Sequence, residues 1–168
     1  MATVTLKGNP INTKGDLPSV GSKAPNFELA KDNLSDVTLD DYKGSRVIMN
    51  IFHSIDTGTC AASVRQFNEK ASGLENVKIL CISKDLPFAM ARFCGAEGIE
   101  NIETLSDFRN GNFGNSYNLT YIDGPIRGLL ARSIIILDES GKILYTEQVQ
   151  EVVEEPNYQA ALDALANA

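Results

Sequence analysis

The chain has 168 residues, 43% of them hydrophobic and 22% charged, which is ordinary usage for a globular domain of this size. Fifteen basic against twenty-two acidic residues leave a formal net charge of -7, which disfavours nucleic acid and anionic membrane surfaces as partners. The sequence has no opening signal segment and no apolar run long enough to cross a bilayer, so we expect a cytoplasmic protein without a membrane partner.

The first third of the chain predicts short strands separated by turn residues. The sequence Gly8-Asn9-Pro10 interrupts two alternating runs, which predicts an N-terminal hairpin within residues 1–15 that is an appendage to the rest. No linker, repeat or low-complexity tract follows, so we expect residues 1–168 to form a single domain. The strands predicted here are residues 3–7, 11–13, 27–30 and 37–39.

The central part is more regular and predicts a parallel unit. Apolar runs with the length of buried strands alternate with helical patterns, and a strand-helix-strand unit of this kind is parallel and right-handed. Gly95 follows the second helical pattern and predicts its end. In chain order, the predicted elements are a strand at 47–52, a helix at 60–72, a strand at 77–83 and a helix at 86–94.

The last part predicts a hairpin and a helix after a polar, Gly-rich stretch at 107–128. Strands at 132–137 and 142–149 flank a short turn, and Pro156 begins a helix that runs to Ala166. A β-α-β unit followed by a β-β-α unit is the order of the thioredoxin-like fold. We therefore expect an α/β protein with a central mixed sheet flanked by helices and an N-terminal β-hairpin.

One thiol stands at the start of the helix predicted at 60–72. Cys60 follows Thr57-Gly58-Thr59, where unpaired N–H groups and the positive end of the helix dipole favour the ionised sulfur over the thiol. The spacing Thr57-x-x-Cys60 replaces the Cys-x-x-Cys of thioredoxins, so a second sulfur for local dithiol exchange is missing. The pattern predicts a reactive thiolate and disfavours a plain disulfide reductase.

The other two cysteines predict different environments. Cys81 alternates with Val77 and Ile79 inside a buried strand, which indicates a core residue. Cys94 lies on a helix with a buried face, where a cysteine is either a packing residue or a second redox thiol. No pair has zinc-type spacing, so we expect no metal site.

A longer pattern surrounds these residues and carries a family resemblance. It consists of three segments in order: residues 54–65 around Cys60, residues 91–99 around Cys94, and Gly124-Pro125-x-x-Gly128-Leu129-x-Ala131-Arg132. The pattern resembles the bacterial thiol peroxidases, a subfamily of the atypical two-cysteine peroxiredoxins. The likeness covers essentially the whole chain, the N-terminal hairpin included.

The resemblance implies a peroxidase that reduces hydrogen peroxide and organic hydroperoxides, uses no cofactor and forms a homodimer. By position it makes Cys60 the peroxidatic cysteine, Cys94 the resolving cysteine, Thr57 the hydroxyl partner of the sulfur and Arg132 the guanidinium that stabilises the thiolate. It also implies an intramolecular Cys60–Cys94 disulfide that thioredoxin reduces. Two alternatives stay open: a general thiol-disulfide oxidoreductase, and a redox-sensing module that signals through its disulfide.

Disulfide formation places a demand on the two helices. Cysteines are bridged only when their Cα atoms come within about 7 Å, and two helix-borne cysteines seldom lie that close. We therefore expect the turns around Cys60 and Cys94 to unwind after oxidation.

Arg65, on the Cys60 helix, is expected to form a structural ion pair rather than to bind the sulfur.

One pocket residue departs from the pattern. His53 is the only histidine, and it stands where thiol peroxidases commonly have proline. A proline fixes the loop and shields the sulfur, so its loss predicts a looser pocket and slower catalysis than in a His53→Pro form. A partly protonated imidazole at this place can itself stabilise the Cys60 thiolate.

Overall fold

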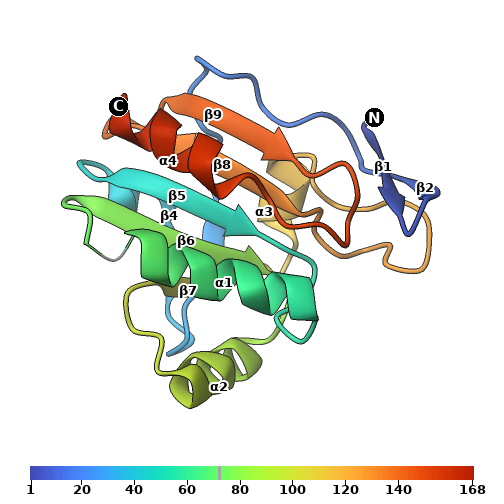
Figure 1. Cartoon of the computed structure of the whole chain (residues 1–168), viewed down its shortest axis with the longest axis horizontal. Helices are drawn as coiled ribbons and strands as arrows, with labels where there is room; N and C mark the ends of the chain where they lie inside the picture. The colour runs from blue at the N-terminus through green and yellow to red at the C-terminus, as the bar shows by residue number, and fades with distance from the viewer. Residues whose placement is uncertain (72) are drawn as a thin grey trace.

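A seven-stranded mixed sheet is the frame of the computed structural model, which describes residues 1–71 and 73–168 (Figure 1). Its strands are β3 (Glu28–Ala30), β4 (Asp36–Thr38), β5 (Arg46–Ile51), β6 (Val77–Ser83), β7 (Glu103–Ser106), β8 (Ser133–Leu137) and β9 (Ile143–Gln148). The order across the sheet is β4-β3-β7-β6-β5-β8-β9. Strands β5, β6 and β7 are parallel, and all other pairs are antiparallel.

Strands β5 and β8 are buried on both faces, which explains why their sequences are continuous apolar runs. Strand β5 pairs in parallel with β6, from Arg46 opposite Val77 to Ile51 opposite Ile82, and antiparallel with β8. All of β8 and all of β5 after its first residue are buried. A strand covered on both faces has no solvent side, and its sequence therefore does not alternate.

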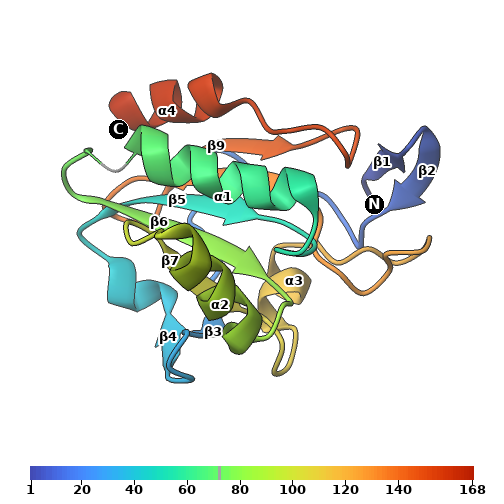
Figure 2. The same cartoon turned by 60° about the horizontal axis from the view of Figure 1, so that its bottom comes forward.

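In the described parts of the chain, four α-helices and one 3-10 helix pack around the sheet. They are α1 (Gly58–Ala71), α2 (Pro87–Glu97), α3 (Asn112–Ser116), α4 (Tyr158–Ala166) and the 3-10 helix η1 (Leu39–Tyr42). Helices α1 and α4 lie side by side on one face, and α2 packs beside them against β7 (Figures 1 and 2). No helix in the described parts of the chain has the length and apolar character needed to span a membrane.

Helix α1 is held by an apolar stripe on its inner face. Val64, Phe67 and Ala71 are buried at helical spacing, and the Phe67 ring meets Tyr158 of α4 edge-on with 5.2 Å between ring centroids. These residues belong to an apolar cluster that also takes in Ile134 of β8. The packing fixes the first turn of α1 at the carboxyl end of β5.

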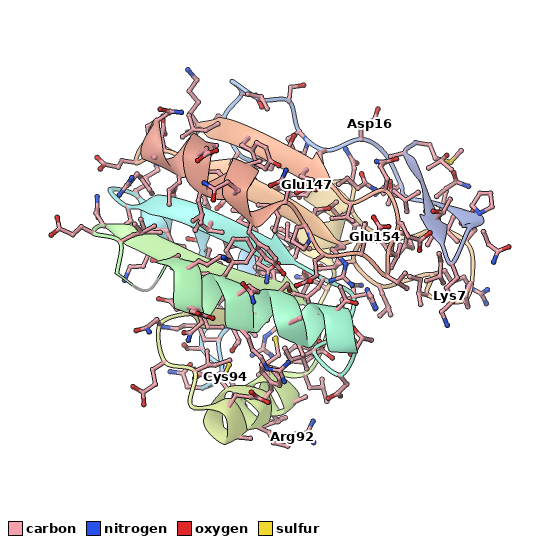
Figure 3. All side chains as sticks on the ribbon, viewed as in Figure 1. Lys7, Asp16, Arg92, Cys94, Glu147 and Glu154 are labelled. Atoms are coloured by element: carbon pink, nitrogen blue, oxygen red, sulfur yellow. The ribbon has the colours of Figure 1, made fainter. Side chains whose placement is uncertain are left out.

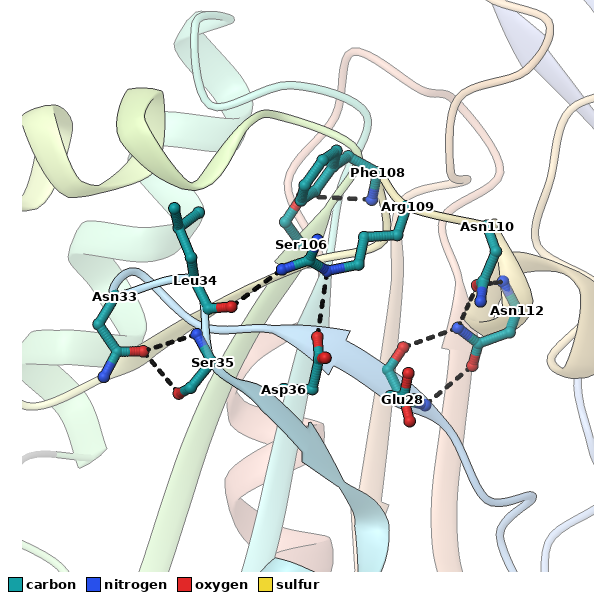
Figure 4. Close-up of polar contacts among 10 residues, drawn as sticks. All are labelled: Glu28, Asn33, Leu34, Ser35, Asp36, Ser106, Phe108, Arg109, Asn110 and Asn112. Atoms are coloured by element: carbon teal, nitrogen blue, oxygen red, sulfur yellow. Dashed lines mark hydrogen bonds and ion pairs between the residues drawn. The ribbon is translucent and has the colours of Figure 1, made fainter.

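Polar contacts hold the edge hairpin of β3 and β4 to the stretch before α3 (Figure 4). Arg109 donates from Nη2 to the Leu34 carbonyl oxygen at 2.9 Å and from Nε to Asp36 at 3.1 Å. The Asn112 side chain bonds both the N–H and the carbonyl oxygen of Glu28. A stretch whose composition indicates a loop is thus ordered by side-chain contacts across the sheet edge.

The fold class predicted from the sequence is confirmed, including the mixed sheet and the N-terminal hairpin. Strand β7 and helix α3 were not predicted, because each is short and lacks a clear apolar period. The prediction that the second helix ends at Gly95 is wrong, since α2 continues to Glu97 and Gly98 ends it with φ +67°. The end predicted for the first helix, Ser72, lies outside the described residues.

The N-terminal hairpin differs from its prediction in turn and in role. Strands β1 (Thr3–Leu6) and β2 (Asn9–Asn12) are joined by Lys7 and Gly8, whose φ angles of +51° and +82° form a tight two-residue turn. Val4 and Ile11 are buried in the main apolar core. The expectation of an appendage is therefore wrong, because the hairpin packs into the main core.

The two glycines near the end of α2 should respond in opposite ways to substitution. A Cβ at Gly95 meets nothing within 4 Å, so Gly95→Ala should stabilise the protein by about 0.5–1 kcal/mol through helix propensity. Gly98 needs its left-handed backbone, so Gly98→Ala should cost about 1 kcal/mol. Urea unfolding of both variants checks this, and destabilisation by Gly95→Ala would contradict the observed helix end.

Candidate active site

The site is built around Cys60 in the first turn of α1. The chain leaves β5 at Ile51, runs through a loop at residues 52–57 and enters the helix at Gly58. Cys60 has no exposed surface, although it lies at the end of the sheet where the parallel strands finish. Its sulfur is therefore held out of water, and any charge on it needs partners within the protein.

The charge balance at Cys60 favours the thiolate. Burial raises the pKa of the Cys60 thiol, but a hydrogen bond with His53, the charges of Arg132 and His53, and a weaker hydrogen bond with Thr57 together lower this pKa to about 7. An ordinary cysteine titrates at about 8.5. A substantial share of Cys60 is thus ionised at neutral pH.

His53 lies directly against the sulfur. Its Nδ1 is 3.7 Å and its Nε2 3.9 Å from Cys60 Sγ, so either ring nitrogen is within reach of a sulfur hydrogen bond. Cys60 is fully buried with the imidazole beside it, and this contact lowers the pKa of the Cys60 thiol. The effect of the missing proline on the pocket and on the rate stays a prediction.

Arg132 supplies buried donors next to the site. It precedes β8, and its residue surface is 1% exposed. Its Nε donates to the Val152 carbonyl oxygen at 2.9 Å, whereas Nη1 and Nη2 have no hydrogen-bond partner among the described residues. A buried guanidinium with unpaired donors is suited to receive an anion or a developing negative oxygen.

Two threonines fix the first turn. The Thr57 hydroxyl donates to the Ser54 carbonyl oxygen at 3.0 Å, on the loop before the helix, and lies close enough to Cys60 to lower its pKa. The Thr59 hydroxyl donates to the Val153 carbonyl oxygen at 3.0 Å. The turn that carries Cys60 is therefore anchored both to its own loop and to a segment near the C-terminus.

Asp85 holds the same loop from the side of α2, and sequence reasoning did not find it. One carboxylate oxygen accepts from the Ser54 hydroxyl at 3.0 Å, and the other accepts from the Ile55 N–H at 2.7 Å and the Ser83 hydroxyl at 2.6 Å. Asp85 follows β6 by two positions. The one feature of the sequence that could have indicated Asp85 is its position just after β6, at the carboxyl end of a parallel strand next to β5.

Tyr121 was also missed. Its ring is buried, and burial raises the pKa of its hydroxyl to about 12, with smaller electrostatic effects from Arg132 and Cys60. A neutral phenol thus lies close enough to Cys60 and Arg132 to interact electrostatically with both. The residue lies in an irregular segment whose sequence has no periodic pattern that could have placed it there.

Cys94 lies apart from this cluster. It is half-buried on α2, on the side that faces α1 and the sheet, and all three cysteines are free thiols (Figure 3). Burial and the charge of Asp32 raise the pKa of the Cys94 thiol. Cys81 is fully buried in β6, and burial raises its pKa as well, so its prediction as a core residue is confirmed.

Ion pairs join the two cysteine-bearing helices. Arg65 of α1 forms a two-pronged contact with Glu97 of α2 at 2.8 and 3.0 Å, which confirms the predicted structural ion pair. Arg92 of α2, labelled in Figure 3, reaches Asp56 of the Cys60 loop at 3.2 Å. The structure thus assembles His53, Thr57, Cys60 and Arg132, and holds Cys94 on a neighbouring helix.

No set of three or more His, Cys, Asp or Glu side chains in the described ranges is arranged to hold a metal ion. The donors near Cys60 are those of His53, Thr57 and Arg132, which bind oxygen or sulfur through hydrogen bonds. The arrangement can therefore present a thiolate to an oxygen-containing electrophile. It can also stabilise negative charge on the oxygen that leaves.

Comparison with known proteins agrees with this geometry. The family model described as Redoxin matches residues 19–162. The chain belongs to the Redoxin family. It is 52% identical to proteins named thiol peroxidase from Mycobacterium bovis and Mycobacterium tuberculosis, over 98% of this chain and 99% of each relative. The resemblance to bacterial thiol peroxidases inferred from the sequence is confirmed.

Solved structures of other proteins share the fold. A peroxiredoxin-like protein from Aquifex aeolicus superposes with a TM-score of 0.93 and 34% identity, over 98% of this chain and 96% of that one. A thiol peroxidase from Chromobacterium violaceum superposes with a TM-score of 0.90 over the same shares at 22% identity. The seven-stranded sheet and the hairpin are thus those of a peroxiredoxin thioredoxin-like fold.

Replacing His53 tests the charge balance at the sulfur. Proline cannot donate to Cys60, so in His53→Pro we expect the pKa of Cys60 to move from about 7 toward the ordinary thiol value of about 8.5. The rate of alkylation by iodoacetamide then rises with pH about a new, higher midpoint. The sequence alone predicts faster catalysis with proline, whereas this contact predicts slower catalysis at pH 7. An unchanged midpoint would show that His53 does not stabilise the thiolate.

Proposed function

We propose that this protein is a thiol peroxidase that reduces hydrogen peroxide and organic hydroperoxides with Cys60 as the attacking group. The observation that carries the proposal is a fully buried thiol with a pKa lowered to about 7 beside the unpaired donors of Arg132. Family membership and 52% identity to proteins named thiol peroxidase support it.

In the first step the Cys60 thiolate attacks the nearer peroxide oxygen. A sulfur–oxygen bond forms as the oxygen–oxygen bond breaks, the sulfur is oxidised to a sulfenic acid, and the leaving oxygen takes a proton from water to become an alcohol or water. Negative charge grows on the leaving oxygen, where Nη1 and Nη2 of Arg132 are available to donate. The guanidinium keeps its own proton throughout.

In the second step Cys94 resolves the sulfenic acid. Its sulfur attacks the Cys60 sulfur, a disulfide forms, and the hydroxyl of the sulfenic acid leaves as water with the proton of the Cys94 thiol. The turn around Cys60 and part of α2 have to unwind first, because both cysteines lie within packed helices. The contacts that open include the ion pairs of Arg65 with Glu97 and of Arg92 with Asp56.

The reductant and the assembly state follow from the same proposal. A dithiol protein of the thioredoxin type reduces the exposed disulfide, and such a partner fits a cytoplasmic location. A homodimer is supported by large apolar side chains left in solvent, among them Leu86 and Phe88 at the start of α2. Sedimentation velocity measures the assembly state directly.

A general thiol-disulfide oxidoreductase is the main alternative for the same cysteines. That activity uses two neighbouring thiols that exchange without rearrangement, whereas Thr57 replaces the nearer one here and Cys94 is on another helix. A redox-sensing module would consume peroxide only once per molecule. Catalytic turnover distinguishes the peroxidase from both alternatives.

Peroxide consumption with thioredoxin, thioredoxin reductase and NADPH tests the assignment of both cysteines. We expect Cys60→Ser to abolish turnover, since serine is not ionised at neutral pH, and Cys94→Ser to stop after one equivalent of peroxide. Cys81→Ser is the matched control and should keep turnover if the variant folds. Insulin reduction without peroxide turnover would favour the oxidoreductase, and a single equivalent consumed by the unmodified chain would favour the sensor.

Stiffening α2 should slow the resolving step alone. Gly95→Ala removes a flexible position next to Cys94, and its expected stabilisation of about 0.5–1 kcal/mol makes unwinding about two- to fivefold rarer. Rapid mixing should show sulfenic acid forming at the normal rate and the disulfide forming more slowly. Equal slowing of both steps, or of neither, would contradict unwinding at this part of α2.

A further inference from the structure

The segment at residues 149–154, which we call the C-terminal strap, encloses Arg132 between its backbone groups. The Val149 N–H donates to the Arg132 carbonyl oxygen at 3.0 Å. Three positions later, the Val152 carbonyl oxygen accepts from Arg132 Nε at 2.9 Å, the only hydrogen bond of this guanidinium among the described residues. The strap thus fixes both the main chain and the side chain of Arg132.

The strap also reaches the turn that carries the reactive sulfur. The Val153 carbonyl oxygen accepts from the Thr59 hydroxyl, one residue before Cys60, at 3.0 Å. Consecutive carbonyl groups of the strap therefore bind the guanidinium and the first turn of α1. A shift of the strap would move these two parts of the site relative to each other.

What holds the strap is the N-terminal hairpin, which lies beside it in Figures 1 and 2. Strand β1 forms a parallel bridge with it between Thr5 and Glu151. The Thr5 N–H donates to the Gln150 carbonyl oxygen, and the Val152 N–H donates to the Thr5 carbonyl oxygen, both at 2.8 Å. Val152 is thus fixed by the hairpin through its N–H and holds Arg132 through its carbonyl.

Glu151 is the side chain that joins the strap to the hairpin turn. Its carboxylate accepts from the Thr5 hydroxyl at 2.6 Å, the Lys7 N–H at 2.8 Å and the Gly8 N–H at 3.1 Å. Lys7 and Gly8, which both have positive φ, present successive N–H groups to the two oxygens of this carboxylate. These bonds lower the pKa of Glu151 to about 2, so the acceptor is ionised at neutral pH.

We propose that Glu151 is a positioning residue for the peroxidase reaction: by holding the strap against the N-terminal hairpin, it fixes the Val152 carbonyl that orients Arg132 toward Cys60. Glu151 does not itself touch the sulfur or the peroxide. Without the Glu151 carboxylate, the strap and its Val152 carbonyl are held less firmly in place. Arg132 then stabilises the thiolate and the leaving oxygen less well. The expected change in the rate of peroxide reduction rests on the proposed function. The expected change in the pKa of Cys60 does not, because it is measured without turnover.

A second carboxylate that binds the same hairpin, Asp123, provides the matched control. Asp123 accepts from the Asn12 N–H and side-chain amide, each at 2.7 Å, and so tethers β2 rather than β1. Among the described residues, no hydrogen bond or ion pair joins Asp123 to the strap. Loss of Asp123 weakens hairpin docking without freeing the Val152 carbonyl. A general effect of hairpin docking and a specific effect of Glu151 are therefore separable.

The experiment compares Glu151→Ala, Glu151→Gln and Asp123→Ala, each in a Cys94→Ser chain so that oxidation stops at the sulfenic acid. Two quantities are measured: the pKa of Cys60 from the pH dependence of iodoacetamide alkylation, and the second-order rate of oxidation by hydrogen peroxide. We expect Glu151→Ala to raise this pKa and to slow oxidation on the order of tenfold. Glu151→Gln, which keeps one acceptor oxygen, should act in the same direction but less. Asp123→Ala should stay within about twofold of the parent.

Two results would overturn the inference. One is a folded Glu151→Ala chain, judged by its thermal unfolding midpoint, with the pKa and rate of the parent; if that variant does not fold, Glu151→Gln takes its place. The other is an equal effect of Asp123→Ala. A parent that does not react with hydrogen peroxide would instead reject the proposed function, while a rise of the Cys60 pKa in Glu151→Ala would still support the positioning role.

Discussion

The constraint on which the site depends is the cost of holding a charged sulfur away from water. Burial alone would keep Cys60 protonated, and its pKa is lowered only because His53, Arg132 and Thr57 oppose that cost. Each of these partners needs its own support. The loop of His53 and Thr57 is held by Asp85, and Arg132 by the C-terminal strap, so the surroundings of the sulfur are organised by backbone contacts from distant parts of the chain.

The packing that protects the thiolate also separates it from Cys94. The ion pairs that tie α2 to α1 and to the Cys60 loop, Arg65 with Glu97 and Arg92 with Asp56, lie at the surface, where ion pairs contribute little. In the proposed mechanism, a closed state for peroxide attack and an opened state for disulfide formation share one sheet.

Most of the fold followed from the sequence where apolar patterns are long. The sequence predicted strands β5, β6 and β8 and helices α1 and α4. It did not predict β7 and α3, since segments of four or five residues are too short to show a periodic pattern of apolar residues. In the site, helix position predicted Cys60, and family resemblance supplied Arg132. Val152 binds Arg132 through its backbone carbonyl, and Glu151 binds the hairpin turn, which is far from it in the sequence. Neither contact depends on a pattern that can be recognised in the sequence.

The strap gives the order of chain synthesis a consequence for thiol chemistry. A nascent chain that has passed Cys60 but not yet reached Val152 has neither the carbonyl that orients Arg132 nor the carbonyl that binds Thr59. Its Cys60 should then titrate closer to an ordinary cysteine. On the proposed roles, the Arg132 contribution to the reactivity of this sulfur is complete only when the C-terminal strap has met the N-terminal hairpin.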